Sequence, residues 1–130
     1  GAPPTPGSAL LTAWPATVEA WGALGPEKLV PGRGDALLTA EQCEQAMAGT
    51  QAFLTDLFAT VGAARKDGKS LNEAFAAAKA VMDAKYGDWV IYEHCMPFDV
   101  ARAYDEAGGM VRPQIWTAER DREMWASLNA

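Results

Sequence analysis

Basic side chains are scarce in this chain of 130 residues: 11 lysines and arginines stand against 17 aspartates and glutamates, a formal net charge of −6. Proteins that bind nucleic acid need a basic stripe to meet the phosphate backbone. The acidic balance therefore argues against nucleic acid as a partner. The chain also lacks a polybasic cluster and any apolar run of about 18 residues, so we expect no membrane partner.

Cysteine and histidine are also rare. Cys43 and Cys95 are the two cysteines, and they form no Cys-x-x-Cys pair. This pattern favours two buried thiols in a reducing compartment over a disulfide, which predicts a cytoplasmic protein. His94 is the single histidine, so a dinuclear zinc site cannot be assembled from these residues. We expect the chain to bind no metal and no cofactor of its own.

Apolar residues make up 49% of the chain, which is enough for the core of a single domain over residues 1–130. Two Ser/Thr-x-x-Glu/Gln sequences, typical of helix starts, are followed by apolar residues at three- and four-residue spacing. They predict two helices that form an αα-hairpin, over residues 39–66 and 70–85. A shorter helix is expected over residues 13–24, since Gly25 and Pro26 end it.

The last third of the chain predicts two more helices. One is expected to begin at Pro97 and to end at Gly108-Gly109, and Thr117 caps the other. Lys28–Pro31 is a strand candidate, and Trp89–Tyr92 is either a second strand or a buried turn. The sequence thus predicts a mainly α fold of about five helices with one or two short isolated strands.

A lone strand at Lys28–Pro31 has no evident partner within the chain. Because proteins pair or cover their strand edges, we expect the missing partner in residues that this chain does not contain. The chain would then be a fragment.

Pro31-Gly32-Arg33-Gly34 follows this strand candidate, and Gly68-Lys69-Ser70-Leu71-Asn72-Glu73-Ala74 follows later. With the helix at Trp14–Leu24, this order resembles the C-terminal helical region of metallo-β-lactamase-fold hydrolases of the glyoxalase-II-like kind. Arg33 stands where the family's Pro-Gly-His-Gly motif has a metal-binding histidine, and a guanidinium cannot bind zinc.

The resemblance implies that residues 1–130 are the C-terminal part of a larger α/β sandwich hydrolase. The intact family uses zinc or iron, whose bound hydroxide hydrolyses esters, thioesters or lactams. Since the His-x-His-x-Asp-His cluster is absent, this chain would form a wall of the substrate pocket and would not be catalytic alone. Its partner would be the missing N-terminal catalytic half, or a second copy bound through exposed apolar surface.

Three residues are candidates for lining a substrate pocket: Arg33, Tyr92 and His94. Arg33 could bind a substrate carboxylate, but we favour an ion pair with Asp35 or another acid. His94 lies in the polar, sulfur-bearing sequence Tyr92-Glu93-His94-Cys95-Met96-Pro97-Phe98-Asp99. Glu93, His94, Cys95 and Asp99 could form a metal or acid–base cluster, but we favour a hydrogen-bonded His94 at a helix entry, with Asp99 in the first turn.

Two further functions stay open at this stage. The chain could be an independent helical module that binds a protein or a small ligand through the surface around Trp89–Phe98. It could also be a self-contained enzyme that uses Cys95 or His94, which we rank last because adjacent side chains rarely point at one another. The sequence therefore leaves open whether the chain is an enzyme.

Overall fold

Five α-helices make up most of the computed structural model, which describes all residues from 1 to 130. Their bounds are α1 Trp14–Gly22, α2 Ala40–Lys66, α3 Leu71–Tyr86, α4 Tyr92–Ala107 and α5 Ala118–Leu128. Two short 3₁₀ turns, η1 Pro6–Ser8 and η2 Leu11–Ala13, precede α1. The predicted mainly α fold of five helices is confirmed.

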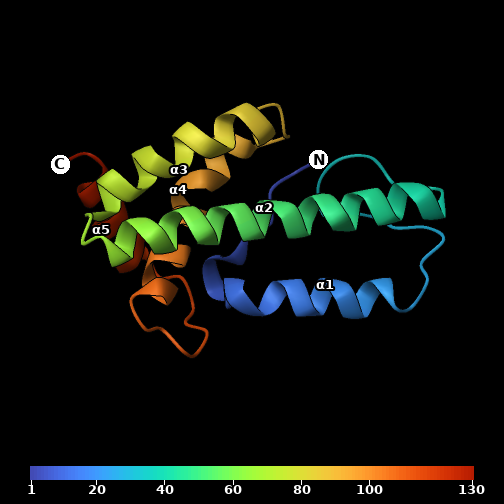
Figure 1. The fold of residues 1–130 in the computed structure, drawn as a ribbon, viewed down its shortest axis with the longest axis horizontal. Coiled ribbons are helices and arrows are strands. Elements are labelled where there is room, and N and C mark those ends of the chain that lie inside the picture. The colour runs from blue at the N-terminus through green and yellow to red at the C-terminus, as the bar shows by residue number, and fades with distance from the viewer.

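Helix α2 runs the length of the molecule and organises the other elements (Figure 1). Helix α1 lies on one side of it, and α3 lies antiparallel to it on the other, with α4 packed against both α2 and α3. The predicted αα-hairpin of α2 and α3 is confirmed, and residues 67–70 form its turn. Its second helix begins with a complete capping box, in which Ser70 and Glu73 exchange side-chain-to-backbone hydrogen bonds.

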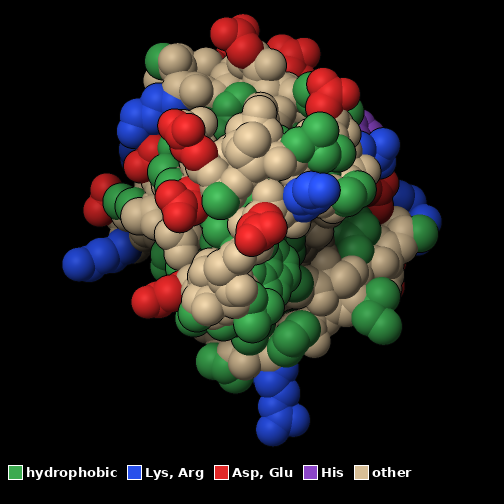
Figure 2. Space-filling view, turned by 90° about the vertical axis from the view of Figure 1, so that its right-hand side faces the viewer, with side chains coloured by type: hydrophobic (Ala, Val, Ile, Leu, Met, Phe, Trp, Pro, Cys, Tyr) green, Lys and Arg blue, Asp and Glu red, His purple; other side chains and the backbone are tan.

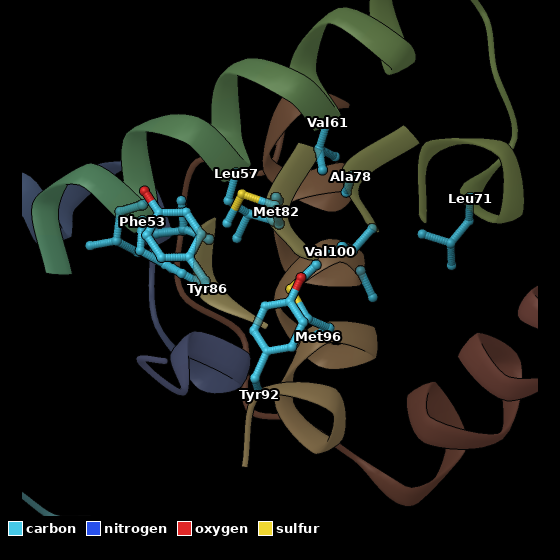
Figure 3. Packing of buried hydrophobic residues seen from close by; sticks show 14 of the residues in the cluster. Phe53, Leu57, Val61, Leu71, Ala78, Met82, Tyr86, Tyr92, Met96 and Val100 are labelled. Atoms are coloured by element: carbon cyan, nitrogen blue, oxygen red, sulfur yellow. The ribbon is translucent and has the colours of Figure 1, made fainter. Parts of the chain in front are cut away.

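The core lies between α2, α3 and α4. Figure 3 shows apolar side chains from these three helices pointing toward one another, among them Phe53, Leu57, Val61, Ala78, Met82, Met96 and Val100. Tyr86 and Trp89 pack on Phe53 at one end, with ring centroids 5.1 and 5.5 Å from the Phe53 ring. Both cysteines are buried and free, as the sequence predicts.

Helix α4 begins at Tyr92, so the predicted start at Pro97 is wrong. Pro97 lies inside the helix, and residues 89–91 form a turn that ends at Ile91, whose φ is 57°. Proline inside a helix removes one backbone hydrogen bond. Tyr92, Met96 and Val100 nevertheless share a helix face that is buried in the core, and this burial offsets the loss. His94 therefore lies in the first turn, whereas Asp99 lies in the middle of the helix and not in its first turn.

The strand candidate at Lys28–Pro31 finds a partner within the chain. Leu29 and Leu37 form an isolated antiparallel bridge, with N–H···O distances of 2.9 and 2.8 Å. The prediction that nothing in the chain pairs with this segment is thus wrong, because the intervening loop folds back on itself. Because this segment is paired within the chain, it gives no evidence for a missing sheet. That the chain is part of a larger hydrolase stays a prediction from the resemblance alone.

Several large apolar side chains are exposed where α1 ends and α2 begins. Figure 2 shows hydrophobic side chains gathered on the face at this end of the molecule. The exposed ones include Trp21, Leu24, Val30 and Leu38. Self-association through this surface stays a prediction. No helix combines the length and the apolar character needed to cross a membrane.

Candidate functional site

Three polar side chains form a buried row along α4. Asp99, Arg102 and Glu106 are three and four residues apart, so they lie on the same side of the helix. Their exposed fractions are 0%, 2% and 8%. Charged groups buried to this extent are stable only when they have partners.

The N-terminal strap, which we define as residues 3–12, supplies partners to two of the three. The Glu106 carboxylate accepts hydrogen bonds from the backbone N–H of Leu11 and from the N–H and hydroxyl of Thr12, the latter two at 3.0 and 2.7 Å. Arg102 donates to the carbonyl oxygen of Gly7. Helix α4 thus binds a segment that lies about 95 residues earlier in the sequence.

Asp99 is the member of the row without a partner. Neither oxygen of its carboxyl group has a hydrogen-bond partner within the protein. Burial raises the pKa of this carboxyl well above its usual range, because the ionised form loses its hydration. The protonated form is therefore favoured, and a ligand could supply the missing hydrogen bonds.

A cavity of about 300 Å³ lies beside Asp99, between the strap and the first half of α4. Its lining residues are Thr5, Gly7 and Ser8 from the strap, and His94, Cys95, Phe98 and Asp99 from α4. This volume is at the lower end of the range for small-molecule sites, about 300–1,000 Å³. The cavity therefore suits a small organic ligand.

Phe98 gives the cavity a rigid aromatic wall. Its ring packs edge-to-face on Trp116 and Trp125, with centroid separations of 5.4 and 6.4 Å. The His94 ring lies 5.8 Å from the Phe98 ring. The strap side is more polar, since Thr5 and Ser8 carry hydroxyl groups. Ser8 Oγ already accepts a hydrogen bond of 2.9 Å from the backbone N–H of Trp116.

Cys95 lines the same cavity as a thiol. Burial raises the pKa of the Cys95 thiol, and Asp99 raises it further, whereas the positive charge of Arg33 lowers it. A nucleophilic cysteine needs a lowered pKa and a base in contact. No hydrogen bond joins Cys95 to His94, so this geometry gives no support to an enzyme built on these two residues.

The three residues predicted to line a pocket do not come together. His94 lines the cavity from the first turn of α4. Tyr92 is buried and does not line it, because its hydroxyl donates to Asp83 Oδ1 at 2.7 Å. Arg33 lies in the exposed loop between Leu29 and Leu37, and it makes no ion pair with Asp35 or any other acid, so the expected ion pair is wrong. Its positive charge still lowers the pKa of the Cys95 thiol.

The alternative of a metal cluster at Glu93, His94, Cys95 and Asp99 finds no support in the geometry. No three of the histidine, cysteine, aspartate and glutamate side chains form a group that could hold a metal ion. Glu93 is exposed in the first turn, whereas Asp99 is buried further along α4.

Sequence reasoning missed Arg102 and Glu106, and it placed Asp99 in the first turn of a helix. The spacing of Asp99, Arg102 and Glu106 could have revealed them, because residues three and four apart lie on the same side of a helix. No family model matches this chain, and no curated protein matches it.

Proposed function

We propose that this chain is a helical binding module that takes a small organic cation, an amine with a short apolar body, in the cavity between the strap and α4. The observation that carries the proposal is the position of Asp99. It is the one member of the buried row on α4 that the strap leaves without a partner.

The donor chemistry of the cavity favours an amine. A protonated amine donates hydrogen bonds and carries the charge that a buried carboxylate needs. The aromatic face of Phe98 attracts a cation and packs against an apolar group at the same time. Thr5 and Ser8 offer hydroxyl oxygens as further acceptors. The net charge of −6 also favours the approach of cations.

The hydrolase interpretation of the sequence stays a prediction. It rests on the order of three sequence features, at residues 14–24, 31–34 and 68–74. None of the contacts around Asp99 bears on it. If it holds, the module would still present its cavity as one wall of a larger pocket, so the binding test below applies to both.

Benzylammonium is expected to bind the full chain at neutral pH, and Asp99→Asn is expected to weaken this binding roughly 10- to 100-fold. The reason is that a hydrogen bond to a charged group contributes about 1.5–3 kcal/mol, and asparagine keeps the shape but loses the charge. Isothermal titration calorimetry measures both affinities. Benzyl alcohol and benzoate, which carry the same ring without the positive charge, are expected to bind more weakly.

The matched control is Asp67→Asn. Asp67 is exposed at the end of α2 and does not line the cavity, so this variant removes one negative charge without touching the site. It is expected to bind benzylammonium like the unmodified chain. Equal affinity for benzylammonium, benzyl alcohol and benzoate would contradict the proposal. So would an equal loss of benzylammonium affinity in Asp99→Asn and Asp67→Asn.

A further inference from the structure

A second cavity, of about 370 Å³, lies at the opposite end of α4 from His94. It is formed where the C-terminal ends of α2 and α4 approach the start of α5, and these parts lie at the same end of the molecule in Figure 1. Three arginines line it: Arg65, Arg102 and Arg120. Asp105 is the only acidic residue in its wall.

Arg120 and Asp105 neutralise each other. Arg120 Nη2 lies 2.9 Å from Asp105 Oδ1, and Arg120 Nε lies 3.1 Å from Asp105 Oδ2. This is the bidentate geometry in which a guanidinium and a carboxylate bind most strongly. The net charge of the cavity wall therefore depends on the other two arginines.

Arg102 is buried without an ionised partner in contact. It donates to the carbonyl oxygens of Gly7 and Gln114 and to the sulfur of Met110, all of which are neutral, and its Nε has no partner. Asp105 and Glu106 are close enough to raise its pKa against the lowering effect of burial. Their carboxylates, however, are already engaged by Arg120 and by the strap.

Arg65 also lacks a carboxylate partner. Its guanidinium lies over the Tyr104 ring, 4.0 Å from the centroid, and it takes part in none of the ion pairs of the chain. The cavity wall thus has two arginines that make no ion pair, in a protein whose net charge is −6.

The start of α5 borders the cavity through its N-cap residue, Thr117, which accepts a hydrogen bond from the Arg120 backbone N–H. A helix N-terminus favours anions. The acidic side chains of this first turn, Glu119 and Asp121, do not line the cavity.

We infer that this cavity binds the phosphate group of a small phosphomonoester, held by Arg65 and Arg102 beside the N-cap of α5. Two guanidiniums that make no ion pair match the nearly doubly charged phosphate of a monoester at neutral pH. Their fixed planar donors suit phosphate oxygens better than a single carboxylate. This site is separate from the Asp99 cavity and does not depend on the function proposed above.

Gly108 offers a way to test the site without removing a charge. A Cβ atom at position 108 would lie 2.8 Å from Arg65 Nη2, whereas the backbone there, with φ −83°, accepts any residue. Gly108→Ala therefore displaces the tip of a flexible side chain. The glycine leaves room for the Arg65 guanidinium beside the cavity.

The test is calorimetric titration of the full chain with inorganic phosphate and with glycerol 3-phosphate at constant ionic strength. Arg65→Gln is expected to weaken binding of both probes about tenfold or more, because it removes a charge-assisted hydrogen bond. Gly108→Ala is expected to weaken it by a smaller factor. Arg112→Gln, which removes an exposed positive charge outside the cavity, is expected to change nothing.

Two results would overturn the inference. The first is that the chain binds neither phosphate probe, whether or not it binds vesicles of phosphatidic acid. The second is that Arg112→Gln loses as much affinity for phosphate as Arg65→Gln does. Circular dichroism checks that each variant is folded. If Arg65→Gln does not fold, Gly108→Ala decides the question. Unchanged benzylammonium binding by Arg65→Gln separates this test from that of the Asp99 cavity.

Discussion

Replacing Glu106 with alanine is expected to lower the free energy of unfolding by about 2–4 kcal/mol, since hydrogen bonds to charged groups contribute about 1.5–3 kcal/mol each and are not additive. The carboxylate accepts three hydrogen bonds from Leu11 and Thr12. Leu11 is only 1% exposed, so its N–H would lose its partner without gaining water. Urea unfolding monitored by circular dichroism measures the change.

The same substitution is expected to release the strap before the rest of the protein unfolds. Hydrogen exchange of residues 3–12 should accelerate in Glu106→Ala more than exchange in the core helices α2 and α3. Glu123→Ala is the control, because the Glu123 side chain is 62% exposed and lies 4.0 Å from its nearest basic partner, Arg120. Equal losses of stability in the two variants would show that Glu106 does not anchor the strap.

The pH dependence of stability is the second large effect, and Asp99 is its source. Burial raises the pKa of the Asp99 carboxyl in the folded state, whereas in the unfolded state it is about 3.9. Above pH 4 the unfolded chain has lost this proton and the folded chain keeps it. The free energy of unfolding therefore falls by about 1.4 kcal/mol per pH unit from this group, until the pH reaches its folded-state pKa.

Asp99→Asn is expected to remove this decrease of the free energy of unfolding with rising pH. The variant should match the unmodified protein near pH 4 and become increasingly more stable than it as the pH rises toward neutrality. Urea unfolding at a series of pH values between 4 and 8 measures the difference. Parallel stability curves for the two proteins would contradict an unpartnered, buried Asp99.

Other carboxyl groups act at lower pH and do not obscure this comparison. A hydrogen bond from Lys85 lowers the pKa of Asp56, and a hydrogen bond from Tyr92 lowers that of Asp83. Their contributions to stability are present above the unfolded pKa and are lost as the pH falls below about 4. They are also common to both proteins, so they cancel in the difference.

Local signals in the sequence predicted the helical hairpin well. The hydroxyls at Thr39 and Ser70 mark the starts of α2 and α3, and the apolar spacing after each marks the face that is buried. Such signals act within one or two helix turns. They fail at Pro97, because the burial of Tyr92 and Met96 in the core outweighs the local preference of proline for a helix start.

The candidate sites were less accessible to sequence reasoning, because long-range contacts create them. His94 was found from its chemistry, but the role of Asp99 depends on a strap that is far away in the sequence. Arg102 and Glu106 look like ordinary surface charges until residues 3–12 cover them. The return of the chain from Leu29 to Leu37 is likewise a tertiary feature, since neither residue predicts a partner eight positions away.

The most direct test of the central claim is a carbon-13 NMR titration of the Asp99 carboxyl group, with and without benzylammonium. The signal is assigned by its loss in Asp99→Asn. We expect it to titrate well above the other aspartates in the free protein, and to shift to the ionised position at neutral pH when benzylammonium is added. An Asp99 carboxyl that titrates in the ordinary range, or that does not respond to saturating benzylammonium, would contradict the account.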